Sequence, residues 1–124
     1  MTQTVGIDLV AVEAVTAAIA EHGERYLSRV YTDAERAACL ERPARLAERF
    51  AVKEAALKAL RPPRDAAVPW RCIELGTGGE LVLTGQAAAL ARDAGLSRFA
   101  VSVSAQDGYA TAVVHATSAV RGDQ

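Results

Sequence analysis

The sequence lacks the features that mark a membrane-bound, secreted or disulfide-stabilised protein. No apolar run approaches the roughly 20 residues that cross a bilayer, and the first residues lack the basic stretch and apolar core of a signal peptide. The two cysteines, Cys39 and Cys72, match neither a metal-ligand spacing nor a disulfide framework, so we interpret them as reduced thiols. We therefore predict a cytoplasmic protein that does not bind membranes.

Positive net charge and aromatic residues are also scarce. The formal net charge is −1 and aromatic residues make up 5% of the chain, whereas a general nucleic-acid binder is usually strongly basic. We therefore predict no nucleic-acid partner. Positive charge is concentrated in residues 25–71, which hold eleven Lys or Arg against six Asp or Glu. Such a segment can face phosphates or an acidic protein, and on composition alone it can equally be a solvated helix surface.

The residue pattern is that of one small domain spanning residues 1–124, with a frayed tail at 118–124. Thr32 and Glu35 have the spacing of a capping box at a helix start, and Pro62-Pro63 should end the longest helix. Together the elements predict an α+β fold. Hydrophobic periodicity predicts strands at 4–10, 72–75, 80–83, 99–104 and 109–117, and helices at 12–21, 32–40, 43–60 and 86–94.

Asp8 is unusual because it interrupts an apolar strand. The segment Val5-Gly6-Ile7-Asp8-Leu9-Val10 otherwise favours burial, and an unpaired carboxylate there would cost several kcal/mol of desolvation. A cation, a basic side chain or backbone donors must compensate. Asp8 is therefore a candidate metal ligand, and an equally simple interpretation is that it caps the helix predicted to start at Val12.

A second candidate patch lies on the longest predicted helix. Glu54 and Lys58 are four residues apart and so share a helix face with Ala47 and Ala51. The small alanines would leave that face low and open to a large polar ligand. The simpler alternative is a solvent-facing Glu–Lys pair that contributes a few tenths of a kcal/mol.

Taken together, the two patches resemble the signature of the holo-acyl-carrier-protein synthase family of phosphopantetheinyl transferases. The matching residues are Gly6-Ile7-Asp8 and the run Arg49-Phe50-Ala51-Val52-Lys53-Glu54-Ala55 followed by Lys58. Residues 25–32 with Glu35, and residues 101–104 with 109–114, are also similar to family segments. The resemblance implies a small antiparallel sheet packed against a long central helix, and a homotrimer with its sites between subunits.

The resemblance also implies an activity. The family transfers the 4'-phosphopantetheine arm of coenzyme A to a serine of an apo acyl carrier protein and releases adenosine bisphosphate. Asp8 and Glu54 are then the predicted ligands of Mg²⁺, an ion that prefers carboxylates, waters and substrate phosphates. Lys58 would contact a phosphate, and Asp8, Glu54 and Lys58 together are the predicted catalytic residues.

Basic side chains are the predicted contacts for the nucleotide and for the carrier. The loop after the helix must contact phosphates through side chains, because Pro62-Pro63 offers no N–H. The predicted carrier contacts are Arg25 and Arg29. The predicted coenzyme A contacts are Arg49, Lys53, Lys58, Arg61 and Arg64.

Some positions depart from the family pattern. Pro62-Pro63 stands in place of a glycine-bearing loop, Ala105 in place of a hairpin histidine, and Ala11 and Ala14 in place of a glutamate and an arginine. These positions fall at nucleotide and carrier contacts. The alternative prediction is therefore a non-catalytic or repurposed relative, which binds coenzyme A or a carrier protein or acts on a carrier-bound thioester.

Overall fold

The computed structural model describes residues 2–119. Its α+β architecture and the long helix at 43–60 confirm the predicted fold class. In chain order the elements are β1 (Gln3–Ala11), α1 (Val12–His22), α2 (Glu24–Val30), α3 (Asp33–Cys39), α4 (Pro43–Leu60), a 3₁₀ turn (Trp70–Cys72), β2 (Ile73–Leu75), β3 (Leu81–Leu83), α5 (Gly85–Asp93), β4 (Arg98–Gln106) and β5 (Tyr109–Thr117).

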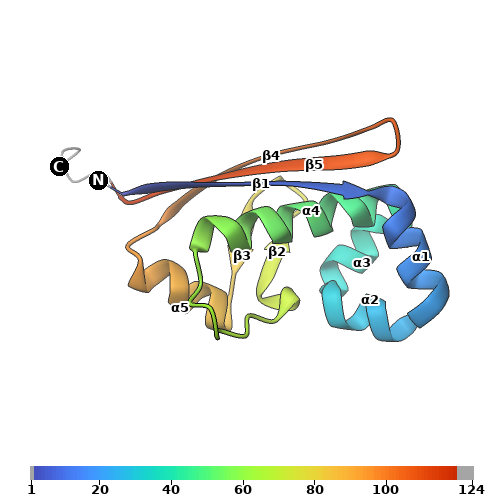
Figure 1. Ribbon diagram of the computed structural model, residues 1–124, viewed down its shortest axis with the longest axis horizontal. Helices are drawn as coiled ribbons and strands as arrows, with labels where there is room; N and C mark the ends of the chain where they lie inside the picture. Colours follow the sequence, from blue (N-terminus) through green and yellow to red (C-terminus); the bar gives the residue numbers. More distant parts are fainter. Residues whose placement is uncertain (1, 120–124) are drawn as a thin grey trace.

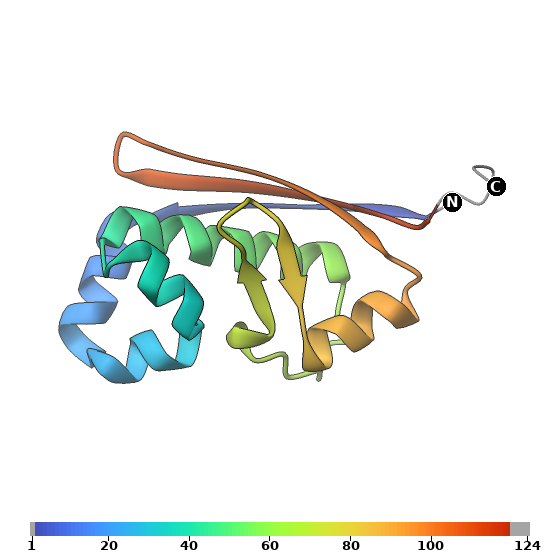
Figure 2. The same ribbon diagram turned by 180° about the vertical axis from the view of Figure 1, so that it is seen from behind.

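Helix α4 lies at the centre of the fold. An antiparallel sheet with the strand order β1-β5-β4 covers one side of it (Figure 1). The other side packs against α1 and α3 near one end and against β2 and α5 toward the other end (Figure 2). None of the helices in residues 2–119 is long and apolar enough to cross a membrane.

The sequence of α4 explains both its length and its close contact with the sheet. Pro43 occupies the first turn, where its missing N–H costs nothing, and Arg61 ends the helix in a left-handed conformation just before Pro62. The interior consists of strong helix formers. Four alanines one turn apart are fully buried: Ala47, Ala51, Ala55 and Ala59.

Those buried alanines correct one expectation. Ala47 and Ala51 do not leave an open face for a ligand, because the sheet covers them. Their small size instead lets β1 approach the helix backbone. The approach is closest at Gly6, where a Cβ atom would lie 1.8 Å from the carbonyl oxygen of Ala55. Gly6 therefore has a packing role.

The apolar side chains of strand β1 point away from α4, although their hydrophobicity favours burial against it. Val5, Ile7 and Leu9 lie on the outer face of the sheet, with 51%, 61% and 61% of their surface exposed. The inner face, toward α4, carries Gly6 and Asp8. Asp8 is thus not enclosed by its apolar neighbours along the strand but points the other way, because side chains alternate between the faces of a strand.

Two local features complete the comparison with the predicted elements. Helix α2, at Glu24–Val30, was not predicted, whereas the capping box of Thr32 and Glu35 is confirmed by both of its hydrogen bonds. In the predicted frayed tail, the Ser118 N–H donates to the Thr2 carbonyl. Residues 120–124 of that tail lie outside the described residues.

Candidate functional site

The structure brings Asp8 and Lys58 into direct contact at the junction of β1 and α4. Lys58 Nζ donates to Asp8 Oδ1 at 2.8 Å and to the carbonyl of Ile7 at 3.0 Å. The Asp8 side chain is only 12% exposed, whereas Lys58 is 55% exposed. Because Ala11 is the N-cap residue of α1, Asp8 does not cap that helix. The predicted solvent-facing pair of Glu54 and Lys58 is likewise replaced by a pair of Lys58 with Asp8.

Glu54 lies one helical turn before Lys58, and its pKa is affected by the charge of Asp8. Burial raises the pKa of Glu54, the negative charge of Asp8 raises it further, and the ammonium of Lys58 acts in the opposite direction. Because the negative charge of Asp8 disfavours ionisation of Glu54, a positive ion between the two carboxylates would be stabilised. The structure thus unites the three predicted catalytic residues: Asp8, Glu54 and Lys58.

The donor set at this junction fits Mg²⁺ better than a softer metal. It consists of hard carboxylate oxygens, and no cluster of three or more His, Cys, Asp and Glu side chains occurs in residues 2–119. Mg²⁺ is usually held by one or two protein carboxylates, with waters and substrate phosphates as the remaining ligands. The protein would therefore provide two ligands, Asp8 and Glu54, and waters and substrate phosphates would supply the others.

Lys53 does not join this site. Its side chain is fully buried on the other side of α4, where Nζ lies 2.7 Å from Glu35 Oε1 and also donates to the carbonyls of Trp70 and Ile73. All three ammonium protons are thereby engaged inside the protein. We correct the prediction that Lys53 contacts the nucleotide, because the packing around α4 turns this residue into the core.

Arg49 is also far less open than predicted. Only 8% of the residue is exposed, and its guanidinium lies 3.6 Å from Glu48. Its Nε is buried and has no hydrogen-bond partner among residues 2–119. Because 10% of the Arg49 side chain is still exposed, Arg49 stays a candidate phosphate contact.

The remaining predicted phosphate contacts lie just beyond α4. Arg61 is the residue that ends the helix, and Arg64 lies in the turn that follows Pro62-Pro63; both are exposed. Arg61 is seven residues after Glu54, or about 10 Å along the helix axis at 1.5 Å per residue. Arg61 therefore lies about two helical turns beyond Glu54, on nearly the same side of α4.

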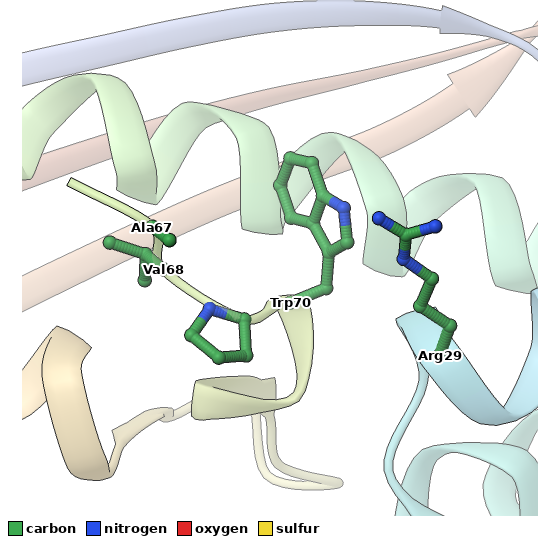
Figure 3. Close-up of a pocket in the computed structure, with 5 residues that line it drawn as sticks. Arg29, Ala67, Val68 and Trp70 are labelled. Carbon is green, nitrogen blue, oxygen red and sulfur yellow. The ribbon is translucent and has the colours of Figure 1, made fainter. Parts of the chain in front are cut away.

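Arg25 and Arg29 line a separate basic surface on α2. Arg25 and Arg29 border one pocket with His22 and Tyr26. Arg29 also lines a second pocket together with Trp70, and Figure 3 shows both side chains. Ala67, Val68 and Pro69 complete that second pocket. The surface combines positive charge with apolar side chains, which suits an acidic protein that also presents apolar residues.

Comparisons with known proteins place the chain in a family. A model of the 4'-phosphopantetheinyl transferase superfamily matches residues 4–114. A holo-[acyl-carrier-protein] synthase of Koribacter versatilis is 40% identical over 116 residues, covering 88% of this chain and 93% of the relative. That of Leptospira biflexa is 39% identical over 118 residues, covering 90% and 93%.

Solved structures agree with this assignment. The acyl carrier protein synthase–CoA complex of Chronobacterium ammoniagenes superposes with a TM-score of 0.82 at 28% identity, covering 97% of this chain and all of that one. The acyl carrier protein synthase of Mycobacterium tuberculosis gives 0.71 at 29% identity, covering 94% and 97%. The fold and the match of most of the chain define a phosphopantetheinyl transferase. This chain belongs to the 4'-phosphopantetheinyl transferase superfamily, and its curated relatives are holo-[acyl-carrier-protein] synthases.

Sequence reasoning missed the roles of two residues. Glu35 was identified as part of a capping box and of a family-like segment, yet it also pairs with Lys53 in the core. Trp70 has no sequence pattern that indicates a binding role, yet it lines the same pocket as Arg29. Both roles depend on contacts between distant segments, and no local pattern reports them.

Proposed function

We propose that this protein transfers the 4'-phosphopantetheine arm of coenzyme A to a serine of an apo acyl carrier protein, with Mg²⁺ bound by Asp8 and Glu54. The observation that carries the proposal is the junction of β1 and α4, where two carboxylates and an ammonium converge in a chain of this superfamily. The relatives' names and the CoA complex of a structural neighbour support the two substrates.

In the proposed reaction the serine oxygen attacks the phosphorus that bears the pantetheine arm. A new phosphorus–oxygen bond forms, and the bond to the bridging oxygen breaks. Adenosine bisphosphate leaves with that electron pair, and the serine proton passes to a base. Mg²⁺ would offset charge on the diphosphate when bound. Lys58 can contribute a mobile point charge, since its exposed side chain can turn from Asp8 toward a phosphate.

The basic surface of α2 is the proposed docking site for the carrier. Arg25 and Arg29 supply positive charge, and Tyr26 and Trp70 supply apolar surface beside it. This surface and the carboxylate site meet at α4, because the Trp70 ring packs on Phe50, one turn before Glu54, with 5.2 Å between ring centroids. A carrier bound at α2 would therefore lie near the end of the coenzyme A arm.

We further propose a homotrimer whose subunits meet through the outer face of the sheet. The exposed apolar residues of that face lie on adjacent, paired strands: Val5, Ile7 and Leu9 on β1 and Tyr109 and Val113 on β5. A contiguous apolar patch of this kind is typical of a subunit interface. The opposite side of β1 carries Asp8, so a trimer built on this face would place the sites beside the subunit boundaries.

The free thiols of Cys39 and Cys72 are consistent with the proposed cytoplasmic location.

Mass spectrometry of apo carrier proteins incubated with enzyme, coenzyme A and Mg²⁺ tests the proposal. The parent should add the mass of one phosphopantetheine arm. Asp8→Asn and Glu54→Gln should slow the transfer by more than about a hundredfold, the scale of losing an electrostatic stabiliser. Glu13→Gln, which removes an exposed carboxylate on α1, is the matched control.

Two results would contradict the proposal. If both site variants modify the carrier as fast as Glu13→Gln, the carboxylates do not form the site. If the parent binds coenzyme A or the carrier tightly without any mass change, the chain is a binding protein of this fold.

A further inference from the structure

The buried ion pair of Lys53 and Glu35 has no part in the carboxylate site. Both side chains are essentially fully buried, at 0% and 1% exposure, and their charged atoms lie 2.7 Å apart. Replacing a buried ion pair by apolar side chains is often neutral or stabilising, so stability alone is a weak reason for such a pair. Its hydrogen bonds indicate what else it does.

Each partner of the pair holds a different part of the chain. Lys53 Nζ donates to the carbonyls of Trp70 and Ile73, which lie in the 3₁₀ turn and at the start of β2. Glu35 Oε2 accepts the N–H of Leu75, and Oε1 accepts the N–H of Thr32 at the start of α3. The pair therefore anchors residues 70–75 to α3 and α4 at once.

Trp70 is the anchored residue that reaches the surface. Its carbonyl is held by Lys53 at 3.2 Å, its ring packs on Phe50 of α4, and it lines the same pocket as Arg29 (Figure 3). The backbone preceding Trp70 is a loop from Arg61 to Pro69, which could not hold the ring by itself. The position of Trp70 in the pocket therefore depends on its contacts with buried residues of the core.

We infer that the Lys53–Glu35 pair is a positioning device, which fixes Trp70 as the wall of the carrier-docking pocket at a set distance from Glu54. The inference rests on the proposed function for the identity of the docking partner, and on the hydrogen bonds alone for the placement of Trp70. Lys53 and Glu35 act through Trp70 and touch neither substrate.

The chain contains one tryptophan, so its fluorescence reports Trp70 directly. The test variant is the double substitution Lys53→Met with Glu35→Gln, which removes both charges and avoids leaving one buried charge unpaired. We expect it to retain the circular dichroism of the parent, while acrylamide quenches Trp70 at least about twofold more efficiently. The control, Glu24→Gln with Arg36→Met, removes an exposed ion pair between α2 and α3 and should leave quenching unchanged.

Transfer kinetics give the second readout. The KM for the carrier should rise about tenfold in the double variant, the equivalent of 1.4 kcal/mol, while the KM for coenzyme A and kcat at saturating carrier stay within about twofold, a split that loss of folded enzyme cannot produce. Trp70→Ala, which keeps the ion pair, should raise the carrier KM in the same way.

The outcomes separate this inference from the proposed function. Parent-like quenching in the folded double variant overturns the positioning role, as does a parent-like carrier KM. An unchanged carrier KM in Trp70→Ala overturns the assignment of the pocket. If the parent itself transfers nothing, the proposed function fails, and the quenching comparison still decides whether the pair holds Trp70. Should the double variant unfold, Lys53→Gln with Glu35→Gln, which replaces the ion pair by two neutral polar side chains, repeats the quenching test, and Trp70→Ala still tests the pocket.

Discussion

Replacing Gly6 by alanine should separate β1 from α4 and disable the site at their junction. The new Cβ atom would lie 1.8 Å from the Ala55 carbonyl oxygen and 2.9 Å from the Ala59 amide nitrogen. Both are backbone atoms of a buried helix, so they cannot rotate aside. The strand must move instead, and with it Asp8, two residues further along.

The cost can be estimated from the depth of the overlap. Overpacking a well-packed core costs typically about 1–3 kcal/mol and occasionally more. A contact of 1.8 Å against backbone belongs at the upper end, so we expect a loss of about 3 kcal/mol in the free energy of unfolding. In a domain of this size that corresponds to a fall of roughly 12 °C in Tm. In addition, a shift of Asp8 by about 1 Å would misplace one of the two carboxylates that bind the metal ion. We expect this displacement to lower the activity by up to about a hundredfold.

Urea denaturation and Mn²⁺ titration measure the two effects. Gly78→Ala is the matched control, because its Cβ atom would meet only the flexible carboxylate of Glu80, at 3.1 Å. We expect the control to change stability by less than about 0.5 kcal/mol. The reasoning is refuted if the unfolding free energy of Gly6→Ala lies within about 1 kcal/mol of that of Gly78→Ala and Gly6→Ala binds Mn²⁺ like the parent. The close contact of β1 with α4 would then not hold Asp8 in place.

Three further predictions concern titration, assembly and the start of α3. In the protein without added metal, the Glu54 carboxyl should titrate above its ordinary value of 4.5, and Asp8→Asn should lower that midpoint without restoring 4.5, because burial is the larger cause; carbon-detected NMR measures both. With this pKa raised, the contribution of protonated Glu54 to stability is complete below 4.5 and is lost as the pH rises through the folded-state pKa. Ile7→Asp, at an exposed position, should convert the proposed trimer to monomers with unchanged circular dichroism, and light scattering that shows a trimeric variant would refute the proposed interface. Thr32→Ala should cost about 1 kcal/mol of stability through loss of the helix cap, with Thr32→Ser retaining it, and equal unfolding free energies for the two variants would exclude a stabilising cap.

Much of the site could be predicted from the sequence because its residues sit in recognisable patterns. The Gly6-Ile7-Asp8 segment and the helix with Glu54 and Lys58 identified the family and named the residues that the structure brings together. Lys53 could not be placed in this way. A lysine beside a predicted metal ligand suggests a phosphate contact, and only the packing of β2 and α3 on α4 shows that it points inward.

The chain's local patterns determined its elements: the bounds of α4 follow from Pro43 and Pro62, and the start of α3 follows from Thr32 and Glu35. These signals act over a few residues, so they can be recognised in the sequence alone. The tertiary structure alone decided which face of β1 meets α4, that Gly6 is the point of contact, and that Trp70 and Arg29 line one pocket. Each of these features depends on register and packing between segments tens of residues apart. The free energy of such contacts is distributed over many side chains, so no single position in the sequence predicts them.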